Sequence, residues 1–209
     1  MNYQPLVSEI EKLKSSDVKN KIAERILEFK NTGKGGCEEL YKELCYCILT
    51  ANFSAERAIR IHGKICERLC DISGYELEKI LKESGYRFPF KAEYIVSARK
   101  YKEAIKDLLE KNIGEEEFRT WLIKNIKGLG YKEASHFMRN IGYSNIAIID
   151  RHILNILEKF KILNHPKTLT AKKYMEIERL LREIAAQANL TLAELDLYLW
   201  YMETGQVLK

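Results

Sequence analysis

The chain has 209 residues, 31 % charged and 46 % hydrophobic, so it is long enough to bury a core as one domain or as two closely packed lobes. A balance of 35 Lys and Arg against 30 Asp and Glu gives a net charge of +5, which suits a polyanionic partner but excludes a histone-like polycation. No run of about 18 apolar residues is present. The N-terminus also lacks a basic segment followed by an apolar one, so we expect an intracellular protein of the cytoplasm or nucleoid, with no membrane partner.

Apolar residues recur at helical spacing along almost the whole chain, and only three prolines interrupt it. This pattern predicts an all-α protein with helices over residues 5–14, 18–30, 38–50, 55–70, 74–83, 91–111, 115–126, 132–141, 151–160, 171–188 and 192–203. N-cap side chains precede four of them, namely Ser54, Asp150, Thr170 and Thr191. Glycines follow two of them, at Gly142 and Gly205. The segment 143–149 is the one that looks extended.

The cysteines all lie in the first third of the chain, at Cys37, Cys45, Cys47, Cys66 and Cys70. Their odd number, without a secretory signal, argues against a disulfide framework. A metal site is conceivable but lacks the CxxC spacing, and the four histidines have no ligand-like grouping. We expect buried or partly buried thiols, no metal and no cofactor.

A Gly-x-Gly turn, Lys127-Gly128-Leu129-Gly130, separates helices 115–126 and 132–141. Such a helix-hairpin-helix offers main-chain N–H groups and a helix N-terminus to a phosphate of a DNA backbone, which positions a protein without reading sequence. Lys124, Lys127, Lys132 and Arg139 oppose only Glu133 in this region, which favours phosphate locally. The alternative is an ordinary αα-turn that contains glycines.

Two side chains near this turn have reactive potential. Lys132 begins the second hairpin helix, where the helix dipole and neighbouring cations disfavour its ammonium form, and a neutral amine can form a Schiff base. Asp150 follows four apolar residues and precedes a helix, so it is expected to be an N-cap whose carboxylate could stabilise positive charge on a sugar ring. The alternatives are a solvated lysine and a purely structural cap.

Taken together, Gly128-Leu129-Gly130-Tyr131-Lys132, the apolar segment 146–149 and Asp150-Arg151-His152 resemble the signature of the helix-hairpin-helix DNA glycosylase superfamily. Residues 44–52 resemble the early helix and turn of that superfamily, so the match covers most of the chain. With a lysine at position 132, the chain resembles the bifunctional members of the superfamily, which join base excision to strand cleavage.

The short chain, the lack of an N-terminal β domain and the ending from Leu195 to Lys209 resemble the compact 8-oxoguanine DNA glycosylases of archaea and some bacteria. Endonuclease III relatives carry a four-cysteine iron–sulfur motif after the catalytic aspartate, whereas no cysteine follows Cys70 here. The resemblance implies a monomer with two helical lobes, 1–30 together with 132–209, and 31–131 ending in the hairpin.

The resemblance also implies roles for individual residues. Lys132 would attack the sugar carbon of a flipped nucleotide, and Asp150 would stabilise the cationic transition state. Lys127, Gly128 and Gly130 would bind the backbone of damaged double-stranded DNA. The residues expected to recognise or stack on the lesion are Lys209, the C-terminal lysine implicated in that subfamily, with Asp196, Trp200, Phe88 and Phe90.

Three other functions stay open at this point. A bifunctional glycosylase for oxidised pyrimidines would keep Lys132 and Asp150 but need a different pocket. A non-catalytic DNA-binding module would use the hairpin alone. A helical interaction protein would show no salt-dependent binding to duplex DNA.

Overall fold

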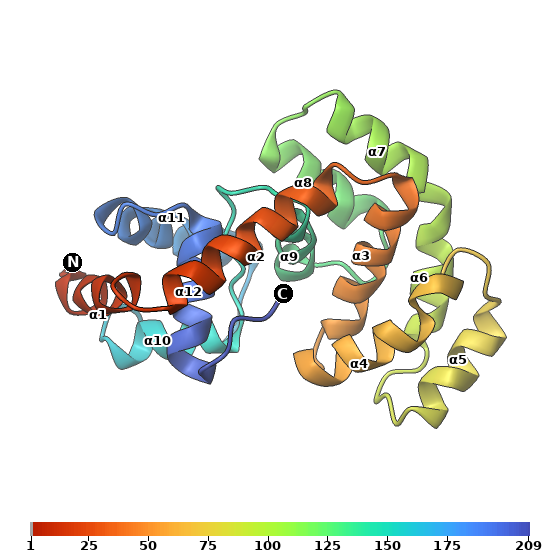
Figure 1. Cartoon of the computed structure of the whole chain (residues 1–209), viewed down its shortest axis with the longest axis horizontal. Coiled ribbons are helices and arrows are strands. Elements are labelled where there is room, and N and C mark those ends of the chain that lie inside the picture. Colours follow the sequence, from red (N-terminus) through yellow and green to blue (C-terminus); the bar gives the residue numbers. More distant parts are fainter. Residues whose placement is uncertain (1) are drawn as a thin grey trace. The chain divides into compact units, whose positions relative to one another are not determined.

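The computed structural model describes residues 2–209, and the regular elements among them are all helical (Figure 1), which confirms the predicted fold class. In chain order the elements are α1 (Gln4–Lys14), α2 (Val18–Gly33), α3 (Cys37–Thr50), α4 (Ala55–Ile65), η1 (Cys66–Arg68), α5 (Gly74–Glu83), α6 (Lys91–Ala98), η2 (Arg99–Tyr101), α7 (Lys102–Glu110), α8 (Glu115–Asn125), α9 (Tyr131–Asn140), α10 (Arg151–Lys159), α11 (Ala171–Gln187) and α12 (Leu192–Thr204). The elements η1 and η2 are short 3₁₀ helices.

Two of the predicted helices were too long. The stretch 55–70 ends as an α-helix at Ile65, and the stretch 91–111 is divided by η2 into α6 and α7. The second break lies where Arg99 Nη2 donates hydrogen bonds to the carbonyl oxygens of Leu69 and Ile72. Over three residues the apolar spacing of a 3₁₀ turn is nearly that of an α-helix, so the sequence pattern did not distinguish them.

Side-chain caps fix where several helices begin. Ser54, Thr170 and Thr191 each accept a hydrogen bond from the backbone N–H three residues later, as predicted. Thr191 also forms a reciprocal capping box with Glu194. After α9 the chain turns through Gly142 at φ +99°, where an added Cβ would lie 3.1 Å from Lys30 Cα.

The chain forms two compact units. One unit consists of residues up to 31 together with 138–209, and the other consists of Thr32–Phe137. The lobes expected from the sequence, 1–30 with 132–209 and 31–131, stay a prediction.

In the unit 32–137, α3 is buried along nearly its whole length and packs against α4, α6 and α7. A helix that is apolar on several faces belongs at the centre of a core, and α3 is such a helix. In the other unit, α12 packs against α1, α10 and α11. It is buried on nearly all sides, through Leu192, Ala193, Leu195, Asp196, Leu197, Tyr198 and Leu199.

The cysteines form no disulfide within the described residues. Cys45 and Cys47 are buried and the other three are partly buried, as expected. Burial raises the pKa of the Cys45 and Cys70 thiols, and a hydrogen bond to Glu103 raises the pKa of Cys37. Between residues 2 and 209 no helix has the combined length and apolarity needed to cross a bilayer.

Candidate active site

The predicted hairpin is present, and its turn lies in the unit 32–137. Helix α8 ends at Asn125, and α9 begins at Tyr131 after the turn. Gly128 has φ +91°, and a Cβ added there would lie 2.5 Å from Cδ2 of Tyr94. Both the backbone conformation and the close approach of the Tyr94 ring therefore require glycine at this position.

The positive charge of Lys127, in the turn, is partly neutralised by Glu93. Lys127 Nζ lies 2.8 Å from Glu93 Oε1 and 4.9 Å from the centre of the Tyr94 ring, and the ion pair is largely exposed. The pKa of Lys127 is raised, first by its hydrogen bond to Glu93. An exposed pair of this kind is weak, so Lys127 can exchange its carboxylate partner for a phosphate.

Lys132 occupies the first turn of α9, and 26 % of its side chain is exposed. Its Nζ lies 3.4 Å from Oε1 of Glu133, whose other oxygen, Oε2, accepts a hydrogen bond of 3.3 Å from the Gly130 N–H. One carboxylate thus contacts both the amide of the turn and the amine predicted to be the nucleophile.

Lys91 at the start of α6 is a buried lysine that sequence reasoning missed. Its Nζ donates to the carbonyl oxygens of Ile48 (2.9 Å) and Ala51 (2.6 Å) at the C-terminal end of α3. Burial lowers the pKa of Lys91 to about 8, while Glu133 raises this pKa and Lys132 lowers it. A lysine in an aromatic stretch is usually solvated, and no local pattern indicated that this one binds carbonyl groups.

A row of aromatic rings in the same unit ends within α6. Phe53, Tyr86, Phe88, Phe90 and Tyr94 form successive edge-to-face contacts with ring centres 4.5–6.2 Å apart. Phe90 is one of the large exposed apolar residues, and Phe88 is half-buried. The predicted stacking residue Phe90 is therefore accessible to a base.

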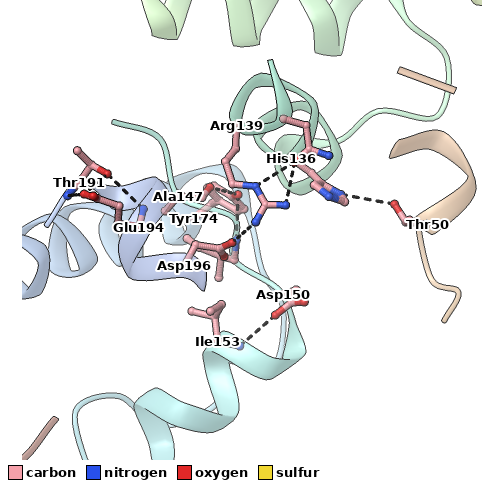
Figure 2. Close-up of polar contacts among 12 residues, drawn as sticks. Thr50, His136, Arg139, Ala147, Asp150, Ile153, Tyr174, Thr191, Glu194 and Asp196 are labelled. Carbon is pink, nitrogen blue, oxygen red and sulfur yellow. Dashed lines mark hydrogen bonds and ion pairs between the residues drawn. The ribbon is translucent and has the colours of Figure 1, made fainter. Parts of the chain in front are cut away.

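Asp150 is the N-cap of α10 in the other unit, as predicted. Its Oδ1 accepts a 3.0 Å hydrogen bond from the Ile153 N–H, which Figure 2 shows as a dashed line. The preceding residues 143–149 form neither a helix nor a strand, and the extended conformation expected there stays a prediction. Tyr174 holds this segment, because its hydroxyl donates to the Ala147 carbonyl (2.7 Å) and accepts from the Ile149 N–H (3.2 Å).

Asp196 is buried on α12 and is paired with a buried arginine. Its Oδ2 accepts a 2.6 Å hydrogen bond from Arg139 Nη1 (Figure 2). Arg139 also donates to Asn140 Oδ1. Burial raises the pKa of Asp196 to about 6, against the opposing effect of Arg139. Arg139 is only 4 % exposed, so the expectation that it contributes to a phosphate-attracting surface was wrong.

Trp200, on α12, contacts a histidine that follows Asp150. The ring centres of Trp200 and His152 are 4.5 Å apart, and His152 Nδ1 lies 4.0 Å from Glu203 Oε1. The buried Nε1 of Trp200 has no hydrogen-bond partner among residues 2–209. Lys209 is half-buried. The residues before it, 205–208, and residues of α2 line a cavity of about 360 Å³.

A family model described as 8-oxoguanine DNA glycosylase matches residues 22–190. The chain belongs to the 8-oxoguanine DNA glycosylase family. An 8-oxoguanine DNA glycosylase/AP lyase of Methanocaldococcus jannaschii is 52 % identical over 206 residues, which cover 98 % of this chain and 99 % of the relative. A protein of the same name from Korarchaeum cryptofilum is 48 % identical over the full length of both chains.

Solved structures agree with this family membership. The crystal structure of the M. jannaschii 8-oxoguanine glycosylase/lyase in complex with 15mer DNA containing 8-oxoguanine matches with a TM-score of 0.94 and covers 98 % of this chain and 99 % of that one. The 8-oxoguanine DNA glycosylase of Thermotoga maritima matches with a TM-score of 0.92 at 37 % identity over the whole of both chains. The predicted helix-hairpin-helix glycosylase fold is thereby confirmed.

Each of the two units contains some of the predicted site residues. The unit 32–137 contains Lys127, Gly128, Gly130, Lys132, Phe88 and Phe90. The other unit contains Asp150, Asp196, Trp200 and Lys209. The roles of these residues are proposals, developed below.

Proposed function

We propose that this chain is a bifunctional DNA glycosylase and AP lyase that excises 8-oxoguanine from duplex DNA. The observation that carries the proposal is its identity of 52 %, over 98 % of the chain, to a protein named for that activity, together with a lysine two residues after the Gly-x-Gly turn. Its partner is damaged double-stranded DNA. We further propose that it acts as a monomer in the cytoplasm or nucleoid.

The proposed reaction begins when the damaged nucleotide is turned out of the duplex, because its sugar carbon cannot be reached inside it. The lone pair of neutral Lys132 Nζ attacks C1′ while the C1′–N9 bond breaks, and the base leaves with the bonding electrons. Asp150 stabilises the positive charge that develops on the sugar, since its carboxylate is held in place as the cap of α10.

The lyase step follows from the covalent intermediate. The lysine–sugar adduct loses a proton from nitrogen. The C1′–O4′ bond then breaks as O4′ takes up a proton, and the resulting iminium makes the C2′ proton acidic. Removal of that proton expels the 3′ phosphate by β-elimination, which cuts the strand. Water then hydrolyses the Schiff base and regenerates Lys132.

Roles in binding follow from position. Gly128, Gly130 and Lys127 would bind the DNA backbone at the hairpin, because a helix N-terminus and its N–H groups favour phosphate. Phe88, Phe90 and Trp200 would stack on bases, and Lys209 and Asp196 would distinguish the oxidised base.

The test is borohydride trapping on a labelled duplex with one 8-oxoguanine opposite cytosine. We expect a covalent adduct with the native protein and none with Lys132→Gln or with an undamaged duplex. Lys124→Gln is the matched control, because Lys124 is exposed at the end of α8 and should still give the adduct. An adduct that persists in Lys132→Gln identifies another amine as the nucleophile, and a native protein that traps only an oxidised-pyrimidine duplex has a different substrate.

A further inference from the structure

The segment that precedes Asp150 is held by side chains of a helix. The Ala147 N–H donates to Glu178 Oε2 at 3.0 Å. The Tyr174 hydroxyl donates to the Ala147 carbonyl oxygen at 2.7 Å and accepts from the Ile149 N–H at 3.2 Å. In a β-ladder, these main-chain groups of alternate residues would pair with a neighbouring strand. Two side chains of α11 therefore do for this segment what a second strand does in a sheet.

Tyr174 and Glu178 lie one turn apart on α11 and so belong to the same face of that helix. Both are almost completely buried, with 2 % and 1 % of their surface exposed, respectively. Burying a hydroxyl or a carboxylate costs free energy unless the group is hydrogen-bonded, and residues 147–149 supply such bonds. A shift of the segment by one residue would break all three of them. The pairing therefore specifies one position of the segment along α11.

A further contact holds the segment at its other end. Arg182 Nη2, also on α11, donates to the Asn145 carbonyl oxygen at 3.0 Å, and this contact is exposed. Tyr174 instead bonds inside the core to Ile149, the residue directly before Asp150. Of these contacts with α11, that of Tyr174 with Ile149 lies closest along the chain to the carboxylate proposed to act on the sugar.

The place of the Asp150 carboxylate depends on this contact. Its Oδ1 accepts the 3.0 Å cap bond from the Ile153 N–H (Figure 2). The cap bond uses this one oxygen, so the position of the main chain at Asp150 decides where the other oxygen, Oδ2, lies. A charge that stabilises a transition state must already be in place, and a misplacement of about 1 Å can lower a rate by about a hundredfold. The hold on Ile149 therefore bears on the chemical step.

We propose that Tyr174 and Glu178 are positioning residues for base excision, which hold residues 147–149 against α11 and so fix the main chain that presents Asp150 to the sugar. Neither side chain needs to touch the substrate, because each acts through Asp150. This inference rests on the proposed function, in which Asp150 stabilises the positive charge that develops on the sugar. All of these residues belong to the same compact unit.

The decisive variant is Tyr174→Phe, which removes only the hydroxyl and keeps the buried ring. Its matched control is Tyr3→Phe. The Tyr3 hydroxyl donates to Glu183 Oε2 of α11 at 2.9 Å, and Tyr3 is 6 % exposed, so the control also removes a tyrosine hydroxyl bonded at α11. A difference between the two variants therefore reports on the contacts with residues 147–149.

The first measurement follows amide hydrogen exchange by NMR in the free protein. We expect the Ile149 amide to exchange at least about tenfold faster in Tyr174→Phe, because its acceptor is gone. The Ile153 amide, which Asp150 caps, should also exchange faster, and both amides should be unchanged in Tyr3→Phe. An unchanged Ile149 amide, a faster Ile149 amide with an unchanged Ile153 amide, or equal changes in both variants overturns the proposal.

The second measurement is single-turnover excision from a duplex with one 8-oxoguanine opposite cytosine, at saturating enzyme. We expect Tyr174→Phe to lower the rate by about tenfold to a hundredfold and to leave the Kd for this duplex within about twofold. Tyr3→Phe should change neither quantity. Weaker binding by Tyr174→Phe with an unchanged rate, or an equal loss of rate in Tyr3→Phe, contradicts a positioning role.

Glu178 is tested by two variants of similar length. Glu178→Gln keeps an oxygen that can accept from the Ala147 N–H, whereas Glu178→Met has no such oxygen. We expect Glu178→Gln to excise 8-oxoguanine at least about tenfold faster than Glu178→Met. Equal losses of rate in the two variants would show that the hydrogen bond to Ala147 does not support the reaction.

The two proposals fail in different ways. A native protein that releases no 8-oxoguanine contradicts the proposed function, whereas the exchange of the Ile149 and Ile153 amides still decides whether Tyr174 holds Asp150 in place. A native protein that excises the base, with Tyr174→Phe as fast as Tyr3→Phe, retains the proposed function and loses this inference.

Discussion

Arg139 Nη1 lies 2.6 Å from Asp196 Oδ2, and both side chains are almost completely buried. The guanidinium also lies over the Phe29 ring, with Cζ 4.7 Å from the ring centre. A buried carboxylate paired in this way has lost its water and depends on its one cation. Breaking such a pair leaves an uncompensated charge inside the protein, which costs about 3–5 kcal/mol.

This pair predicts a specific pH dependence of stability. Burial raises the pKa of Asp196 from 3.8 to about 6, so the folded protein binds this proton more tightly than the unfolded chain does. The contribution of Asp196 to the free energy of unfolding is therefore fully present below pH 3.8 and is lost as the pH rises to about 6. The loss is at most about 3 kcal/mol.

Chemical denaturation at several pH values between 4 and 7 checks this, with Asp196→Asn as the comparison. The stability of the variant should lack the fall with pH, because asparagine does not ionise, so the difference in the free energy of unfolding between the two proteins should change between pH 4 and 7. Parallel curves for the two proteins would show that Asp196 does not titrate in this range.

Gly128→Ala should weaken the hairpin. The new Cβ would meet the Tyr94 ring at 2.5 Å, and alanine is strained at φ +91°. We expect a loss of about 1–3 kcal/mol in the free energy of unfolding and weaker binding to undamaged duplex. Gly63→Ala, in the last turn of α4 with nothing within 4 Å of the added Cβ, is the control and should stabilise the protein slightly. Equal stabilities for the two variants would refute the strain at Gly128.

Phe90→Ala should lower binding to lesion-containing duplex without destabilising the fold. The Phe90 side chain is 51 % exposed, so its removal opens little space in the core, while stacking on a base is worth about 1–3 kcal/mol. Leu27→Ala removes a comparably exposed apolar side chain, 58 % exposed, from α2 and should change neither property. Fluorescence anisotropy measures the binding of both variants to duplex DNA, and thermal unfolding measures their stability. Unchanged binding by Phe90→Ala would exclude stacking.

Deletion of Lys209 should separate base recognition from strand cleavage. If the terminal lysine recognises the oxidised base, removing it lowers excision of 8-oxoguanine by at least about tenfold. Cleavage of a duplex with a preformed abasic site should be retained, because that reaction has no base to recognise. Single-turnover rates on the two duplexes give the ratio, and an equal loss on both would assign Lys209 a structural role.

The sequence predicted the helices well because their signals are local. Apolar spacing and capping side chains such as Thr191 and Asp150 identify a helix within a few residues of its ends. The 3₁₀ break at Arg99–Tyr101 was missed because it coincides with contacts to Leu69 and Ile72, which are distant in sequence.

Only part of the candidate site was predicted, again because the signals in the sequence are local. Lys132 and Asp150 lie in a motif that can be read along the chain, and the structure places them at helix starts as expected. Lys91 and Arg139 bind groups that only folding brings near, namely the end of α3 and Asp196 on α12. A charged residue whose partner is far away in sequence gives no local indication that it is buried.

The state of the thiols has a consequence for an enzyme that repairs oxidative damage. Peroxide reacts with thiolates far faster than with protonated thiols. The raised pKa values of Cys37, Cys45 and Cys70 keep these side chains protonated at neutral pH, and Cys47 is shielded by burial. At these four positions the thiols are therefore poorly reactive toward the same class of oxidants that create the proposed substrate.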